Sequence, residues 1–148
     1  MSPIEIAAVL CAKFEGFFAR PYLCPAGVPT IGYGATRYPD GRAVTLHDAP
    51  ITRATALLYL QFDLRADAVA VQKLCPGSMA ERRRGALLDF AYNCGVGALR
   101  SSTLRRRVNA ADWESVPAEF RKWVRGGGRV LVGLVRRRNA EAALVVQE

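Results

Sequence analysis

Apolar residues recur with a helical period at the start of the chain. Over residues 3–15 they fall on one stripe, as in a short amphipathic helix. Pro3 suits the first turn of this helix, and Gly16 suits its end. The stripe is formed by Ile4, Ala7, Ala8, Cys11 and Phe14.

The helical period is lost over residues 17–47, where proline, glycine and aromatic residues dominate. Three short strands are predicted, at residues 22–24, 30–34 and 43–46. Gly27 and residues 39–41 supply the turns between them. We therefore expect a small antiparallel sheet, which needs a helix to pack on because so few strands are marginally stable alone.

A long helix is predicted next, with Thr52 as its N-cap and Pro76-Gly77 after its end near Leu74. Its main apolar stripe is formed by Leu57, Leu60, Leu64, Ala68 and Val71. Further apolar residues widen that stripe, namely Leu58, Phe62 and Val69. Both sides of this helix are therefore expected to be packed, as in a spine between two lobes.

Helices dominate the second half of the chain. Ser78 and Glu81 fit a capping box, and the helix that follows would reach about residue 93. Further helices are predicted at residues 102–109, 117–124 and 131–146, and glycines 126–128 form a flexible joint. This order predicts a single α+β domain over residues 1–148. The β lobe would cover about residues 16–50, and the helical lobe residues 75–148 together with the N-terminal helix.

The net charge is +8, and the basic residues are concentrated in the second half. Residues 75–148 hold 14 basic and 7 acidic side chains, including arginine triplets at 82–84, 105–107 and 136–138. Such a field attracts polyanions, whether nucleic acid, acidic lipid or an anionic cell envelope. A solvated surface that favours solubility explains the same charges, so charge alone names no partner.

The cysteines do not predict a metal site. Cys11, Cys24, Cys75 and Cys94 fit no zinc spacing, and His47 is the only histidine, so we expect neither a metal nor a cofactor. The opening apolar run is too short for a secretory signal, and Glu5 interrupts it. We therefore expect a cytoplasmic product with reduced cysteines and no signal peptide.

Glu15 is the first candidate for chemistry. It ends the first predicted helix, where the helix dipole disfavours a negative charge, and it follows Phe14 and precedes Phe17 and Phe18. If these rings desolvate it, the carboxyl would hold a proton near neutral pH, as a general acid must. A solvated carboxylate at a helix end is the simpler alternative.

Cys24 and Thr30 follow on the predicted hairpin, which would turn them back toward Glu15. Each also has a structural explanation, Cys24 as a small buried residue and Thr30 as an ordinary strand residue. The spacing Glu-x8-Cys-x5-Thr, followed by Ile-Gly-Tyr-Gly, resembles the phage lysozyme family of muramidase endolysins. The resemblance continues through residues 90–97 and 102–104, Trp123 and its glycine loop, and residues 133–141.

This resemblance implies a lysozyme-like fold, in which a long helix joins the two lobes and a substrate cleft lies between them. It implies hydrolysis of the β-1,4 bond between N-acetylmuramic acid and N-acetylglucosamine in bacterial peptidoglycan, and hence lysis of the host cell. Glu15 matches the general acid, and Thr30 the threonine that helps to hold the attacking water. Cys24 stands where most relatives carry aspartate. A thiolate there could be a base, a nucleophile or a stabilising anion, whereas a thiol could only position water.

The same resemblance implies that Tyr92 and Asn93 face the substrate, although helix packing explains them nearly as well. It also suggests that Arg137 lies near Glu15. The expected partner is a peptidoglycan glycan strand rather than nucleic acid, and the protein is expected to be a monomer. It would wait in the host cytoplasm until release to the cell wall or periplasm.

Three other activities stay open. A basic helical module could bind nucleic acid through the arginine triplets, although these lie on three predicted helices and no recognition helix is apparent. Lytic transglycosylase chemistry at the same bond would leave an anhydro-sugar in place of a hydrated end. A cationic last helix would in addition allow transient contact with an anionic membrane.

Overall fold

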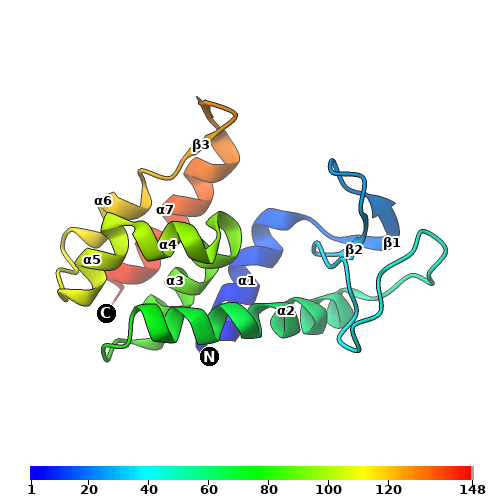
Figure 1. Ribbon diagram of the computed structural model, residues 1–148, viewed down its shortest axis with the longest axis horizontal. Coiled ribbons are helices and arrows are strands. Elements are labelled where there is room, and N and C mark those ends of the chain that lie inside the picture. The colour runs from blue at the N-terminus through cyan, green and yellow to red at the C-terminus, as the bar shows by residue number, and fades with distance from the viewer. Residues whose placement is uncertain (148) are drawn as a thin grey trace.

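A computed structural model describes residues 1–147, and it has a small β lobe and a larger helical lobe (Figure 1). The long helix α2 (Arg53–Leu74) runs beneath both lobes, and α1 (Pro3–Glu15) leads from the helical lobe toward the β lobe. The β lobe contains β1 (Phe18–Leu23) and β2 (Pro29–Gly32). The helical lobe contains α3 (Glu81–Cys94), α4 (Val96–Ser101), α5 (Thr103–Asn109), α6 (Val116–Phe120), the strands β3 (Arg125–Gly126) and β4 (Arg129–Val130), and α7 (Val132–Val146). The predicted α+β architecture is therefore confirmed.

Helix α1 begins and ends where the sequence predicts. Ser2 and Glu5 form a capping box at its start, and Gly16 follows its last residue with a positive φ of 67°. Its buried stripe packs against α3 and α2. At Gly85 of α3, a Cβ atom would lie 2.6 Å from Cγ2 of Ile6, so glycine is what allows α1 and α3 to approach so closely.

The β lobe is smaller than predicted. Strands β1 and β2 pair antiparallel, with Tyr22 opposite Thr30, but the third strand expected at residues 43–46 is wrong. Only an isolated bridge, between Arg37 and Ala43, joins that segment to its neighbour. The loop is held by the Asp48 carboxylate, which accepts hydrogen bonds from the Tyr38 hydroxyl at 2.7 Å and the Thr45 amide at 2.9 Å.

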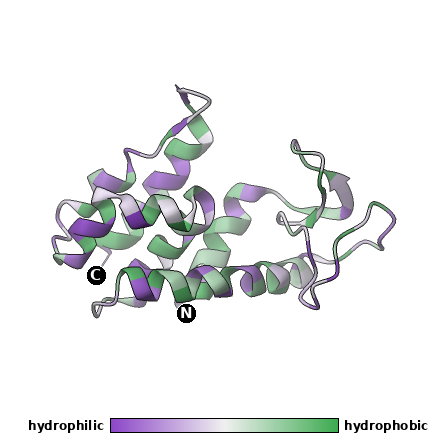
Figure 2. Cartoon of the chain, viewed as in Figure 1, coloured by the Kyte–Doolittle hydropathy of each residue, from purple (hydrophilic) through white to green (hydrophobic). Residues whose placement is uncertain are grey.

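Helix α2 is packed on one side only. Thr52 caps it as predicted, and Leu60, Leu64 and Val71 are buried. The expectation that both sides pack is wrong, because Leu58 and Val69 are 63% and 57% exposed. Hydrophobic residues occur along α2 as well as on the inner helices α1 and α3 (Figure 2). Among the described residues 1–147, the outer side of α2 is left exposed at these positions.

Several boundaries in the helical lobe differ from the prediction. The capping box at Ser78 is wrong: Ala80 is the N-cap of α3, and no side chain caps it. Helix α4 was not predicted, and α6 ends at Phe120, short of the expected residue 124. Gly127 and Gly128 form the turn between β3 and β4, with φ of 60° and 81°. Within residues 1–147, no helix combines the length and the apolar character needed to cross a membrane.

Candidate active site

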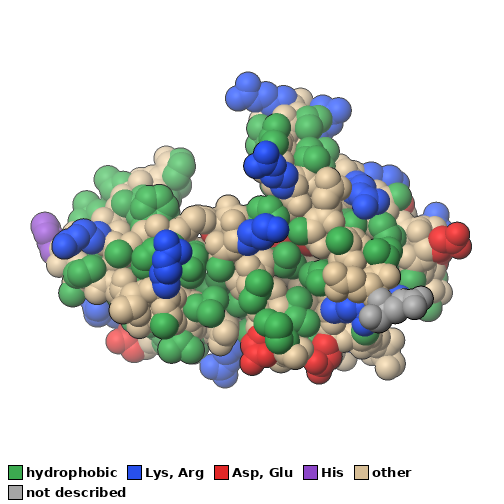
Figure 3. All heavy atoms as spheres, turned by 180° about the vertical axis from the view of Figure 1, so that it is seen from behind, with side chains coloured by type: hydrophobic (Ala, Val, Ile, Leu, Met, Phe, Trp, Pro, Cys, Tyr) green, Lys and Arg blue, Asp and Glu red, His purple; other side chains and the backbone are tan. Residues whose placement is uncertain are grey.

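Glu15 lies at the end of α1 that points toward the β lobe (Figure 1). Seen from behind, the surface of the molecule is hollowed between the two lobes (Figure 3). The Glu15 side chain is 36% exposed, and its Oε1 lies 2.7 Å from Nη1 of Arg137 on α7. Phe18 is itself 46% exposed, so the alternative of a partly solvated carboxylate at the helix end fits the structure better, and the expected approach of Arg137 is confirmed.

Arg137 is buried, and its guanidinium is shared among three elements. Nε and Nη2 donate to the Asp89 carboxylate on α3 at 3.0 and 2.8 Å, while Nη1 donates to Glu15. Nη2 also lies 3.3 Å from Sγ of Cys11 on α1, and that thiol donates to Asp89 at 3.0 Å. The orientation of Glu15 is therefore fixed through side chains from α3 and α7.

Cys24 lies at the turn that connects β1 to β2. Its amide donates to the Val28 carbonyl at 3.1 Å, and its own carbonyl accepts from the Gly27 amide at 2.8 Å. The pKa of the Cys24 thiol is lowered, first by the Val28 amide and then by the Ala26 amide and the Thr30 hydroxyl, although partial desolvation opposes them. A turn of this kind stabilises a thiolate without any nearby cation.

Thr30 lies on β2, where its side chain is close to that turn. It is 3% exposed, and its hydroxyl donates to the Val28 carbonyl at 2.8 Å. The same hydroxyl contributes to lowering the pKa of Cys24. Thr30 and Cys24 are therefore neighbours through the hairpin, as their spacing predicted.

Tyr22 links the hairpin to the end of α1. Its pKa is raised, mainly by burial and then by the negative charges of Cys24 and Glu15. Tyr22 therefore lies within electrostatic range of both groups. Tyr22 thus connects Glu15 with Cys24, and the hairpin connects Cys24 with Thr30.

Tyr92 and Asn93 come from the end of α3 and meet different surroundings. Tyr92 is largely buried, and its pKa is raised by burial and then by negative charges that include Asp63 and Glu15. Asn93 accepts a hydrogen bond at 2.7 Å from Arg138. It also lines a pocket of about 300 Å³ together with Cys94, Lys122, Trp123, Arg125 and Leu134.

The prediction missed a group of buried charges behind Glu15. Asp89, Arg138 and Glu141 are each 0% exposed, and Arg138 contacts Glu141 at 2.8 and 2.9 Å. Burial and the neighbouring Asp89 carboxylate raise the pKa of Glu141. Desolvation opposes ionisation of Asp89, but hydrogen bonds from Arg137 and Glu141 still hold its pKa below the usual value. The one sequence signal was an aspartate inside the apolar run of residues 87–91.

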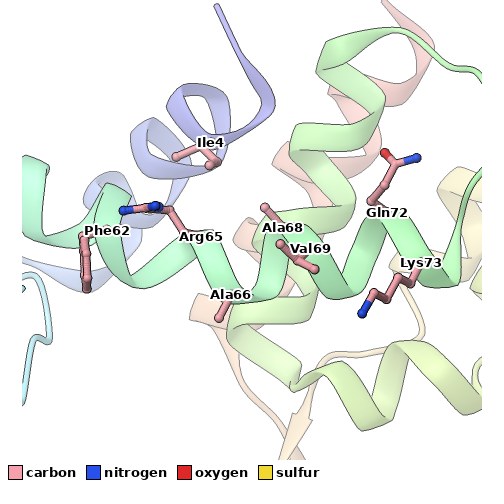
Figure 4. A pocket seen from close by; sticks show the side chains of 8 residues that line it. All are labelled: Ile4, Phe62, Arg65, Ala66, Ala68, Val69, Gln72 and Lys73. Atoms are coloured by element: carbon pink, nitrogen blue, oxygen red, sulfur yellow. The ribbon is translucent and has the colours of Figure 1, made fainter.

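A wide pocket of about 780 Å³ lies elsewhere, along α2 and the start of α1 (Figure 4). Its lining is formed by Ile4, Phe62, Arg65, Ala66, Ala68, Val69, Gln72 and Lys73. These residues include no carboxylate that could serve as an acid for glycosidic bond cleavage. The candidate chemistry therefore belongs to the region between the lobes.

A small β lobe, a helical lobe and a carboxylic acid at the end of the first helix together define a lysozyme-type glycoside hydrolase. Residues 12–141 match the family model described as "Phage lysozyme". The chain belongs to the phage lysozyme family.

Individual relatives agree with this assignment. The endolysin of Acyrthosiphon pisum secondary endosymbiont phage 1 is 31% identical, over 95% of this chain and 94% of its own. The Bacillus phage B103 endolysin is 35% identical over 91% of this chain, which spans only 50% of that longer protein. Among solved structures, the endolysin from Escherichia coli O157:H7 phage FAHEc1 superimposes with a TM-score of 0.86 at 30% identity, covering 99% of this chain and 94% of its own.

Proposed function

We propose that this protein hydrolyses the β-1,4 bond between N-acetylmuramic acid and N-acetylglucosamine in bacterial peptidoglycan, with Glu15 as general acid. The observation that carries the proposal is that Glu15, at the end of α1, and Cys24, at the β1–β2 turn, both act on the same Tyr22 side chain. A glycosidase needs an acid on one side of the bond and a second ionisable group on the other. Glu15 has the position for the first role and Cys24 for the second.

In this mechanism Glu15 protonates the leaving oxygen while the Cys24 thiolate faces the developing oxocarbenium ion. The lowered pKa of Cys24 favours the thiolate relative to an unperturbed cysteine. Thr30 is beside that sulfur and would help to hold the attacking water. Tyr92 and Asn93 would contact sugar rings and acetamido groups from the helical lobe, where Asn93 lines the pocket beside Trp123.

Replacing Glu15 by glutamine tests the proposal, because it removes the proton donor and keeps the shape of the side chain. We expect loss of bond cleavage by about 10²–10⁴-fold, the usual contribution of a general acid. Glu114→Gln is the matched control, since Glu114 is exposed on the helical lobe. Turbidity of permeabilised bacteria gives the rate. An E15Q protein with wild-type activity would refute the assignment.

Mass spectrometry of the released wall fragments distinguishes the two chemistries at this bond. Hydrolysis leaves a hydrated reducing end, whereas lytic transglycosylation leaves an anhydro-sugar. We expect the hydrated product, because the Thr30 hydroxyl lies beside Cys24, where in this proposal it would hold the attacking water. An anhydro product would assign the transglycosylase alternative instead.

Binding of nucleic acid is less well supported, because several arginines of the three triplets make contacts within the protein. Arg84 donates to the Cys75 carbonyl at 3.1 Å, and Arg105 donates to the Leu74 carbonyl at 2.9 Å. Arg137 and Arg138 are buried in ion pairs. These side chains hold helices together and do not form a continuous basic stripe. A salt-sensitive gel shift without lysis would favour the alternative.

We propose that contact with anionic membranes is made by the β3–β4 hairpin rather than by the last helix. Helix α7 has only Arg136 of its triplet exposed, so a cationic face on this helix is wrong. The exposed cations Arg125 and Arg129 lie on the β3–β4 hairpin, which projects from the helical lobe beside the exposed Val130 and Val132 (Figure 1). Arg125→Gln with Arg129→Gln should weaken binding to vesicles of anionic lipid and leave neutral vesicles unaffected.

We further propose that the protein acts as a monomer and stays in the host cytoplasm until it is released to the cell wall or periplasm. Relatives named SAR-endolysin, such as that of Bacteriophage PS119, which is 34% identical over 93% of this chain, support only the release to the periplasm. Fractionation of induced host cells before and after membrane permeabilisation tests the location. Light scattering of the purified protein tests the monomer.

A further inference from the structure

The Arg137 guanidinium lies between two carboxylates of different exposure. Asp89 is 0% exposed and accepts two of its N–H groups, at 3.0 and 2.8 Å. Glu15 is 36% exposed and accepts one, at 2.7 Å. The fork geometry of arginine allows one side chain to serve both partners. Arg137 on α7 therefore contacts Glu15 on α1 directly, and Asp89 on α3 holds the other side of the same guanidinium.

This arrangement has an electrostatic consequence for the acid. A buried charge is unfavourable unless an opposite charge compensates it. Arg137 and Asp89 are both buried and form such an ion pair with each other. Because Asp89 compensates the guanidinium, Arg137 can remain where it is whether Glu15 is charged or neutral. The other nearby carboxyl group, Glu141, is buried and already engaged by Arg138. Without Asp89, the guanidinium would therefore depend more on the Glu15 carboxylate, which would then resist taking up a proton.

We propose that Asp89 is a positioning residue for the reaction, which anchors Arg137 and compensates its charge so that Glu15 is held in place yet can carry a proton. This inference rests on the proposed role of Glu15 as general acid. Asp89 acts through Arg137 and does not touch the substrate.

Other ionisable groups lie around Glu15 and Arg137. They are Cys11 on α1, Tyr22 on β1, Cys24 on the hairpin turn, Asp63 and Asp67 on α2, Tyr92 on α3, and Arg138 with Glu141 on α7. Burial and the neighbouring Asp89 carboxylate raise the pKa of Cys11, so its thiol is neutral and adds no charge. Arg138 is engaged by Glu141. The compensation of Arg137 therefore falls to Asp89.

Asp89→Asn tests this role because it removes the charge and nearly preserves the shape. With Arg137 uncompensated, the Glu15 carboxylate is favoured, so the alkaline fall in activity should move about 1 pH unit lower. At pH values above this alkaline fall, kcat of the D89N protein should be about tenfold below that of the wild type, while KM stays near the wild-type value. A structural role alone would lower the melting temperature and leave the pH limb in place. A folded D89N protein with the wild-type limb overturns the proposal.

A double variant guards against failure of D89N to fold. Asp89→Asn with Arg137→Gln removes both charges together, so no lone charge is left buried. We expect the alkaline fall in activity to return to the wild-type pH. The kcat should stay lower, because Glu15 no longer accepts a hydrogen bond from Arg137. A limb that stays displaced would refute charge compensation. If E15Q abolishes activity while D89N changes nothing, this inference fails and the proposed function stands; if E15Q is fully active, the proposed function fails.

Discussion

Cys24 offers the sharpest prediction, because a thiol replaces the carboxylate usual in the family that this sequence resembles. An unperturbed thiol with a pKa near 8.5 is only about 3% thiolate at pH 7, and each unit of lowering raises that fraction up to tenfold. The Val28 and Ala26 amides and the Thr30 hydroxyl all lower the pKa of Cys24. If the thiolate is the working form, activity should rise with pH as this group ionises.

Cys24→Asp and Cys24→Ser separate the charge from the shape. Aspartate is ionised above about pH 5, so in this variant the acidic limb of the activity profile should move to lower pH. Serine keeps the small polar side chain but stays neutral, so the activity of this variant should fall at every pH. Initial rates of turbidity loss between pH 4 and 9, with matched ionic strength, measure both profiles.

Alkylation provides an independent check of the same reasoning. Cys11 and Cys75 are 0% exposed, so iodoacetamide should reach Cys24 before either of them. Wild-type activity should be lost as Cys24 is modified, with the site identified by peptide mass spectrometry. The Cys24→Asp protein is the control and should resist the reagent. If Cys24→Ser retains full activity and alkylation has no effect, the sulfur has no chemical role.

Three further predictions concern stability. Burial raises the pKa of Asp63 to about 6, so ionisation of Asp63 begins to oppose folding above about pH 4 and opposes it fully above pH 6. Asp63→Asn should therefore raise the melting temperature by about 2–4 °C at pH 8 and leave it unchanged at pH 3. Gly85→Ala would place Cβ 2.6 Å from Cγ2 of Ile6 and should cost about 1–3 kcal/mol in urea unfolding, partly restored by Ile6→Ala. Hydrogen bonds from Thr45 and Tyr38 lower the pKa of Asp48, so the loop it holds should lose hydrogen-exchange protection as the pH falls below about 4, and Asp48→Asn should lack that dependence.

The sequence predicted those features that depend on neighbours along the chain. Pro3 in the first turn of α1, its end at Gly16 and the Thr52 cap of α2 were predicted correctly, because helix ends are set within a few residues. The spacing of Cys24 and Thr30 was informative for the same reason, since one hairpin brings them together. The family motifs extended this local information to the lysozyme-like fold.

Tertiary structure alone decided which surfaces are covered and which charges meet. The outer side of α2 resembles its packed side in sequence, yet no other element lies over Leu58 and Val69. The partner of Asp89 is 48 residues away, and the Arg137–Glu15 contact spans 122 residues. Periodicity describes one element at a time, so it cannot state which helix supplies the opposite charge. The folding of α1, α3 and α7 around one guanidinium makes that choice.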